Sequence, residues 1–146
     1  KFLFDKMTRK IDVKIDMILH ATEDYLKIAD VLYDMFAIKK TEISKRVISG
    51  HFGNTISMLH VDIKKNRAEE FVKKLISQIS KVEMANILDG LQERINNSTL
   101  YLRFSKQNFV KKTLTPEEKD PVRIIIYTPV YVKKEILSTY KKLLAN

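Results

Sequence analysis

Three histidines are the residues of this chain best suited to acid–base chemistry or metal binding: His20, His51 and His60. Their spacing matches neither HxH nor HExxH, so no recognised metal signature is present and no metal site is expected. General acid–base catalysis requires two groups within reach of one substrate atom. His20 and His60 would meet this requirement if they faced each other across paired strands, with Asp62 two residues further on. A histidine-dependent nuclease is therefore one hypothesis for the chain.

The segment SGHFGNT, residues 49–55, has the Gly-x-x-Gly spacing that holds nucleic-acid backbone in KH domains. The KH loop joins two helices, whereas the residues around this segment alternate in the manner of two strands. We therefore expect a hairpin connection in which glycine provides backbone freedom. The segment lacks the Walker Lys-Ser/Thr and the dinucleotide GxGxxG, so nucleotide hydrolysis is not indicated.

The net charge of the chain favours polyanions as binding partners. The 146 residues include 27 Lys and Arg against 18 Asp and Glu, a formal net charge of +9. Such an excess favours nucleic acid as a partner, and an acidic membrane surface second.

Cysteine is absent, which excludes disulfides, thiolate nucleophiles and cysteine-based zinc sites. No apolar run approaches the roughly 18 residues that span a bilayer, so we expect a cytoplasmic protein.

The residues that could bind a ligand must be positioned by strands and helices, which the hydrophobic pattern predicts. Apolar residues alternate with charged ones from Ile11 to Leu19, the period of a half-buried strand. A bulge is expected where the alternation of the second strand slips. The predicted elements are strand 11–19, helix 24–37, strand 39–49, strand 55–63, helix 66–79 capped by Asn66, helix 82–95, strand 99–104, a polar stretch 105–120 that is a short helix or an irregular loop, strand 122–130 and helix 133–144.

These elements predict an α+β fold in the order β-α-β-β-α-α-β-β-α. An antiparallel or mixed sheet of about five strands would carry helices on one face, because each strand has one clearly apolar side. The length and the hydrophobic fraction of 45% suit one domain, residues 1–146, with residues 1–9 as a short tail.

The other face of the sheet would stay partly open. Basic residues interleaved with aromatics form a stacking platform for unpaired bases, although a solvated sheet face also favours such side chains. The residues expected on the open face are Lys14, His20, Tyr101, Arg103, Arg123 and Tyr127, joined by His60 and Asp62 depending on register.

Lysine pairs on helices are typical of solvated surfaces. The pair Lys45-Arg46 and the run from Lys106 to Lys112 instead lie in segments joined to strands. We expect them to border one surface with the glycine loop, where a sugar-phosphate backbone would meet cations and backbone N–H groups together.

Three stretches together resemble a family of small archaeal proteins: HATED at 20–24, GHFGNTI at 50–56 and LYLRFSKQ at 100–107. That family is described as RNA-binding, is predicted to associate with the exosome, and has the fold of the ribosomal protein that binds 5S ribosomal RNA; it was earlier likened to a double-stranded-RNA-binding domain. The resemblance implies RNA binding without catalysis or cofactor. The sequence departs from the family pattern just beyond Gln107, at NFVKK.

By position, the resemblance points to His20, Thr22 and Glu23 after the first strand, His51, Gly53 and Asn54 in the hairpin, and Arg103, Lys106 and Gln107 at the end of the fourth strand. A polar cluster of His20, His51, Asn54, Arg103 and Gln107 would form at one end of the sheet if the first and third strands pair. Such a cluster would either bind a ligand or fix the loops through hydrogen bonds.

Two further hypotheses stand beside the nuclease. The leading one is a non-catalytic RNA-binding protein acting in RNA processing, RNA degradation or ribosome-related work, with exosome proteins as partners. Its RNA-binding residues would be Lys45, Arg46, His51, Asn54, Tyr101, Arg103, Lys106, Gln107, Lys111 and Lys112. The alternative is a protein-interaction subunit or homodimer, which predicts one apolar patch that includes Ile18, Ile48, Ile125 and Val130.

Overall fold

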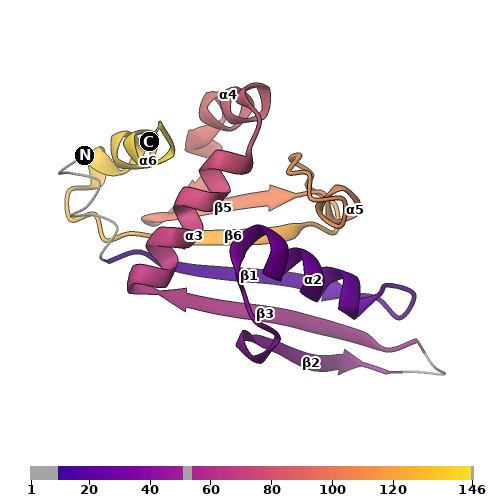
Figure 1. Cartoon of the computed structure of the whole chain (residues 1–146). Coiled ribbons are helices and arrows are strands. Elements are labelled where there is room, and N and C mark those ends of the chain that lie inside the picture. Colours follow the sequence, from indigo (N-terminus) through magenta and orange to yellow (C-terminus); the bar gives the residue numbers. More distant parts are fainter. Residues whose placement is uncertain (1–9, 51–53, 146) are drawn as a thin grey trace.

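An antiparallel sheet is the centre of the computed structural model, which describes residues 10–50 and 54–145 (Figure 1). Within these residues the sheet has six strands in the order β2-β3-β1-β6-β5-β4. The strands are β1 (Asp12–Leu19), β2 (Ile43–Ser49), β3 (Ile56–Lys64), β4 (Ile95–Asn96), β5 (Thr99–Phe104) and β6 (Val122–Tyr127). The helices are α2 (Tyr25–Phe36), α3 (Lys65–Gln78), α4 (Lys81–Asp89), α5 (Lys106–Phe109) and α6 (Ile136–Ala145).

Strand β1 lies between β3 and β6, and its alternation decides which residues enter the core. Val13, Ile15, Met17 and Leu19 are buried, while the residues between them are half-buried or exposed. The same alternation continues along β3, β5 and β6. One face of the sheet is therefore apolar and covered, as period-two patterning requires.

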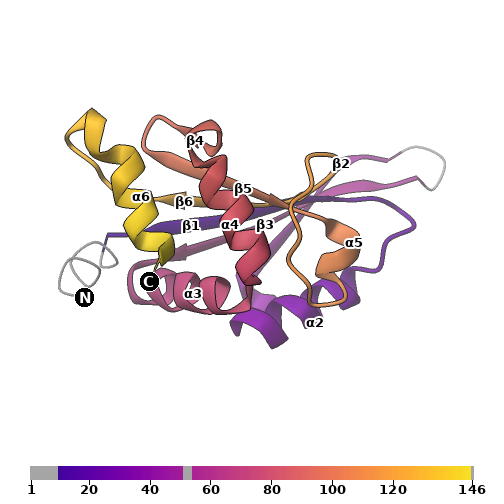
Figure 2. The ribbon, with the colours of Figure 1, turned by 90° about the horizontal axis from the view of Figure 1, so that it is seen from above.

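Helices cover that apolar face. Figures 1 and 2 show α2, α3 and α5 on the same side of the strands. Helix α2 begins where the Asp24 carboxylate accepts a hydrogen bond from the Leu26 N–H at 2.9 Å, a standard N-cap. It ends at Ala37 in the left-handed region. The α+β class and the helix-covered sheet are thus confirmed. None of the helices in residues 10–50 and 54–145 has the length and apolarity needed to cross a bilayer.

The expected bulge is present in β2, where the pairing with β3 shifts between Val47 and Ser49. The stretch 105–120, expected to be a short helix or an irregular loop, begins with the short helix α5. Ser105 caps this helix, because its hydroxyl accepts a hydrogen bond from the Asn108 N–H. Phe109 of α5 is fully buried and stacks on Phe36 of α2. The NFVKK segment therefore anchors this connection to the helix layer.

Several predicted boundaries were wrong. Helix 82–95 stops at Asp89 with Gly90 as its C-cap, and Leu91–Arg94 forms a 3-10 turn. The Arg94 guanidinium donates to the Gly90 carbonyl at 2.9 Å. Residues 95–96 then form β4. Asn66 lies inside α3, whose N-cap is Lys64. Strand β6 ends at Tyr127, because the following Thr128 N–H leaves the ladder to bind Tyr140 and Pro129 has no N–H.

Tyr140 of α6 joins that helix to the end of the sheet. Its hydroxyl lies 2.5 Å from the Ser98 carbonyl oxygen and 3.0 Å from that of Ile126, and accepts from the Thr128 N–H at 3.2 Å. The ring is fully buried. Burial raises the pKa of Tyr140 well above its ordinary value, because the phenolate would lose its hydration.

Replacing Tyr140 with Phe should lower the free energy of unfolding by about 1–2 kcal/mol, because the buried Thr128 N–H would lose its acceptor. Urea unfolding at pH 7 measures this loss, with the exposed Tyr131→Phe as the matched control. Since the pKa of Tyr140 is raised in the folded protein, its hydroxyl contributes stability that is complete below about pH 10 and falls at higher pH. The difference between wild type and Tyr140→Phe should therefore shrink above pH 10; a constant difference would contradict this account.

Candidate nucleic-acid interface

The side of the sheet that faces away from the helices, called here the open face, is half exposed. Strand parity and register place on it the side chains that alternate with the core residues. They are Asp12, Lys14, Asp16 and Ile18 of β1, Met58, His60 and Asp62 of β3, Thr99, Tyr101 and Arg103 of β5, and Arg123, Ile125 and Tyr127 of β6.

Asp16 organises the middle of the open face. Register places it directly between His60 and Arg123. His60 Nδ1 is hydrogen-bonded to Asp16 Oδ1, and Arg123 Nη2 donates to Oδ2 at 3.3 Å. The Asp16 side chain is only 17% exposed. The carboxylate therefore balances the Arg123 charge and orients the His60 ring, whose Nε2 has no partner among the described residues.

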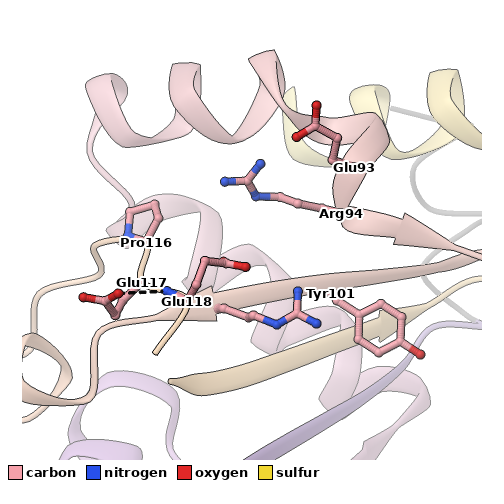
Figure 3. Close-up of a pocket in the computed structure, with 7 residues that line it drawn as sticks. Glu93, Arg94, Tyr101, Pro116, Glu117 and Glu118 are labelled. Atoms are coloured by element: carbon pink, nitrogen blue, oxygen red, sulfur yellow. Dashed lines mark hydrogen bonds between the residues drawn. The ribbon is translucent and has the colours of Figure 1, made fainter. Parts of the chain in front are cut away.

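Tyr101 and Arg103 form an aromatic–cation pair on β5. The Arg103 guanidinium carbon lies 5.8 Å from the centroid of the Tyr101 ring, a cation–π distance. Both side chains line a depression of about 450 Å³ with Arg94, Pro116 and three glutamates (Figure 3). The glutamates are Glu93, Glu117 and Glu118. Because carboxylates outnumber guanidinium groups here, this depression alone is not a polyanion site.

The predicted pair Lys45-Arg46 is divided by the sheet. Arg46 pairs with Met58 and lies on the open face. Lys45 points to the helix side, where its ammonium lies 5.3 Å from the centroid of the Tyr25 ring. Neighbouring residues of a strand project to opposite faces, so both cannot contact one phosphate backbone on the same surface.

Further cations are neutralised by carboxylates on the helix side. Lys112 of the connection after α5 pairs with Asp34 of α2 at 2.9 Å. Arg67 binds Glu42 through both terminal nitrogens, and this hydrogen bonding lowers the pKa of Glu42. Lys111, Gln107 and Asn54 are exposed, and His51 lies outside the described residues. The expected single basic surface is thus split between the two faces, and carboxylates neutralise part of it.

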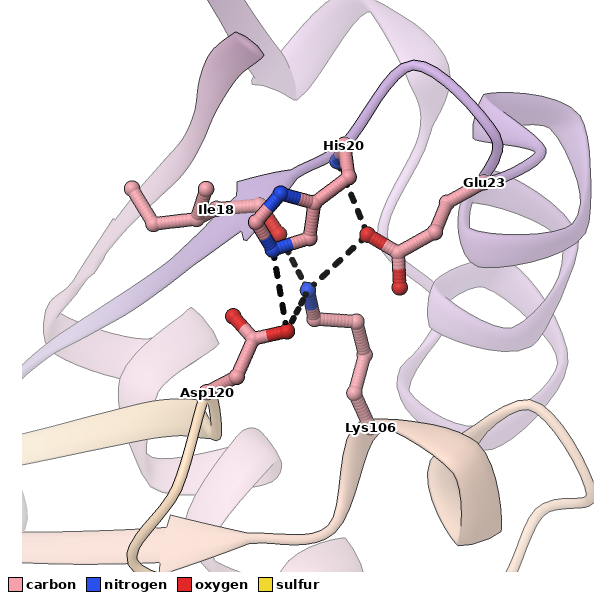
Figure 4. Close-up of polar contacts among 5 residues, drawn as sticks. All are labelled: Ile18, His20, Glu23, Lys106 and Asp120. Atoms are coloured by element: carbon pink, nitrogen blue, oxygen red, sulfur yellow. Dashed lines mark hydrogen bonds and ion pairs between the residues drawn. The ribbon is translucent and has the colours of Figure 1, made fainter.

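Lys106 holds one end of the molecule together (Figure 4). Its ammonium donates to the Ile18 carbonyl, to Glu23 Oε1 at 3.0 Å and to Asp120 Oδ2 at 3.0 Å, and the side chain is 5% exposed. His20 Nε2 lies 3.1 Å from the same Asp120 oxygen. All three N–H groups of Lys106 are therefore used, and none is left for a phosphate.

The ligand atoms of His20, Glu23 and Asp120 lie within 4.8 Å of one another, a spacing that suits a cation. The Lys106 ammonium is itself the cation that these acids bind. The predicted polar cluster at this end of the sheet therefore forms with a different membership: His20 takes part, but its partners are Glu23, Lys106 and Asp120. Arg103 and Gln107 do not join it, and the Thr22 residue is exposed nearby. No feature of the sequence pointed to Asp120, which sits in a turn 100 residues after His20.

The predicted histidine pair does not form. His60 of β3 is opposite Asp16 of β1, whereas His20 follows β1, four residues after Asp16. At a rise of about 3.3 Å per residue, His20 lies roughly 13 Å beyond Asp16. The two rings bind different carboxylates, Asp120 and Asp16. The geometry therefore contradicts acid–base catalysis shared by His20 and His60.

The predicted apolar patch is also interrupted. Ile18 and Ile125 both belong to the open face, but the polar row of His60, Asp16 and Arg123 crosses the sheet between them. Ile48 is 50% exposed at the β2 edge, next to Val47 at 60%. Other exposed apolar side chains lie elsewhere, such as Val82 of α4 at 71%, so the described residues do not form the single apolar patch that was expected.

Known proteins share this fold over most of its length. A crystal structure of a Sulfolobus solfataricus protein of the family DUF54 superposes with a TM-score of 0.72 at 31% identity, covering 92% of this chain and 97% of the other. An Archaeoglobus fulgidus protein assigned to the same family gives a TM-score of 0.78 at 24% identity, covering 92% and 99%. A Pyrococcus abyssi protein named as RNA-binding is 28% identical over 132 residues, 85% of this chain and 86% of that protein.

The match to a family model sets the class of protein. The model, described as RNA binding, matches residues 12–128, from the start of β1 to the residue after β6. This chain belongs to that RNA-binding family. The resemblance carried by HATED, GHFGNTI and LYLRFSKQ is confirmed at the level of the family.

Replacing Lys106 with Met should lower the free energy of unfolding by roughly 2 kcal/mol, because two carboxylates and a carbonyl would lose a charged hydrogen-bond donor. The methionine keeps the apolar stem, so the change isolates the ammonium. Chemical denaturation measures the effect, and Lys111→Met, at an exposed position on the same connection, should change stability by less than about 0.5 kcal/mol. Equal effects of the two substitutions would show that the Lys106 contacts do not matter for stability.

Proposed function

We propose that this chain binds RNA without catalysing a reaction, and that it does so through the open face of the sheet. The observation that carries the proposal is the pairing of Tyr101 and Arg103 side by side on that face. A tyrosine ring stacks on a base, and a guanidinium group both stacks and neutralises phosphate. Membership in a family described as RNA binding supports the proposal.

Three cations of the open face are suited to phosphate contacts. Lys14, Arg46 and Arg103 have no carboxylate within ion-pair distance among the described residues, whereas Arg123 is bound to Asp16. In this proposal Lys106 holds the ends of β1 and β5 in place and does not contact RNA. Lys45 and Lys112 lie on the helix side, and together with the exposed Lys111 they contribute only to the long-range field that attracts RNA.

With about three phosphate contacts to single-stranded RNA, the salt dependence should be moderate. The expected slope of log affinity against log salt is about −2, so raising KCl from 50 to 200 mM should weaken binding roughly twentyfold. Fluorescence anisotropy with a labelled RNA measures this directly. A titration insensitive to salt would argue against phosphate contacts altogether.

Replacing Arg103 with Ala should weaken RNA binding about tenfold and reduce the salt slope by slightly less than one, because one phosphate contact and one stacking surface would be lost. The control is Lys27→Ala, which removes an exposed cation from α2 on the helix side. That variant should retain wild-type affinity to within about twofold. Equal losses from the two variants would mean that binding follows net charge and not the open face.

In the cell, we propose that this chain acts in RNA processing or degradation, alongside exosome or ribosome-related proteins. This role is supported by the sequence resemblance. Affinity capture of the tagged protein, before and after nuclease treatment, distinguishes partners held by RNA from partners held by protein contacts.

A protein-interaction role is the second candidate, and the edge strand favours it. Strand β2 is long for an edge, and it exposes Val47 and Ile48 beside Arg46. Such an edge can pair with a strand of another chain, although its lysine and arginine are typical of residues that block pairing. Sedimentation velocity of wild type and Ile48→Lys tests this: a dimer abolished by the substitution would support the edge, and a monomeric wild type would remove homodimerisation.

A further inference from the structure

A second depression in the open face is not explained by the Tyr101–Arg103 pair. It measures about 420 Å³ and is lined by residues of β1, β3, β5 and β6. It shares only Tyr101 with the depression shown in Figure 3. The two hollows therefore adjoin at Tyr101, and Arg103 lines the first.

Two tyrosines and one isoleucine supply the apolar part of the lining of this second depression. Tyr101 of β5 and Tyr127 of β6 line it, and Ile125 lies opposite Tyr101, two residues before Tyr127 in β6. Register pairs Tyr101 with Ile125 and Thr99 with Tyr127, so the tyrosines are diagonal neighbours on adjacent strands. Such neighbours have Cβ atoms about 7–8 Å apart, within reach of one planar group that contacts both rings. The volume lies in the range of ordinary small-ligand sites, about 300–1,000 Å³.

Polar groups surround the apolar part, among them the carboxylates of Asp12 and Asp16. Asp16 is occupied by His60 and Arg123, and Asp12 lies 3.9 Å from the Lys64 ammonium. The Lys14 ammonium is exposed and has no ion-pair partner among the described residues, so it can meet a phosphate. His60 Nε2 is held in place by the hydrogen bond from Nδ1 to Asp16 and can bind a hydroxyl or a base edge. Aromatic rings for a base, an imidazole for a polar edge and an ammonium for a phosphate together match the parts of a nucleotide.

We propose that this hollow, bordered by Tyr101 and Tyr127, receives one unpaired nucleotide of single-stranded RNA, an inference that rests on RNA binding by the open face. A base within a duplex is already stacked on both neighbours and paired along its edge, so it cannot enter the hollow. An unpaired base can be splayed out and stacked on the rings. The next phosphates would then pass Arg103, because the hollow that Arg103 lines adjoins this one at Tyr101.

The experiment compares two tyrosines. Tyr127→Ala removes a ring of the hollow that is 41% exposed, and Tyr33→Ala removes a ring of α2 that is 60% exposed on the helix side. Each variant is titrated by fluorescence anisotropy with an unstructured 12-nucleotide RNA and with the same sequence in a duplex, at low salt. Circular dichroism and urea unfolding establish that both variants retain the wild-type fold.

Wild type should bind the single strand more tightly than the duplex. Tyr127→Ala should weaken binding of the single strand about tenfold, the effect of losing one base–aromatic stack, and should leave duplex binding unchanged. Tyr33→Ala should change neither affinity. Photocrosslinking of wild type with 4-thiouridine-substituted RNA should label peptides that contain Tyr101 or Tyr127.

Three results would overturn the inference. If Tyr127→Ala binds the single strand within twofold of wild type, the hollow does not bind a nucleotide. Weaker binding by Arg103→Ala would then show that the open face still binds RNA. If the duplex binds as tightly as the single strand and is equally sensitive to Tyr127→Ala, the protein recognises the shape of a duplex and not an unpaired nucleotide. Absence of binding to either RNA by wild type would remove both this inference and the proposed function.

Discussion

The register of β1 between β3 and β6 is the constraint on which the rest of the structure depends. Side chains of a strand alternate with a period of two, so a slip of one residue would exchange the core face with the open face. The observed register buries Val13, Ile15 and Met17 under the helices and places Asp16 between His60 and Arg123. The same register therefore determines both the core and the arrangement of the open face.

Lys106 shows how a charged residue can serve structure at a site that resembles a binding site. Its ammonium connects the end of β1, the turn before α2 and the turn before β6 through one carbonyl and two carboxylates. A lysine buried in this way persists because every N–H group finds an acceptor. With this end of the sheet fixed by internal contacts, the Tyr101–Arg103 pair and the neighbouring hollow remain as the surfaces best suited to a ligand.

Several features of the fold and the site could be predicted because they depend on neighbours in sequence. Tyr101 and Arg103 are two residues apart in a strand, so they share a face whichever strands lie beside them. The same rule separates Lys45 from Arg46, although charge alone suggested that they act together. Boundaries were harder to predict: the apolar periodicity of residues 82–95 continues past Gly90, where the backbone leaves the α-helix and forms a 3-10 turn.

The sequence by itself determined the strands, the helices that cover them and the face on which each strand residue lies, because these follow from local periodicity and the burial of apolar side chains. Only the tertiary structure decided which charges meet. Asp16 and Arg123 are 107 residues apart, and Lys106 is 83 residues from Glu23. Such pairs depend on which strands and turns become neighbours, and the strength of each charge on a surface depends on the partner that the fold supplies.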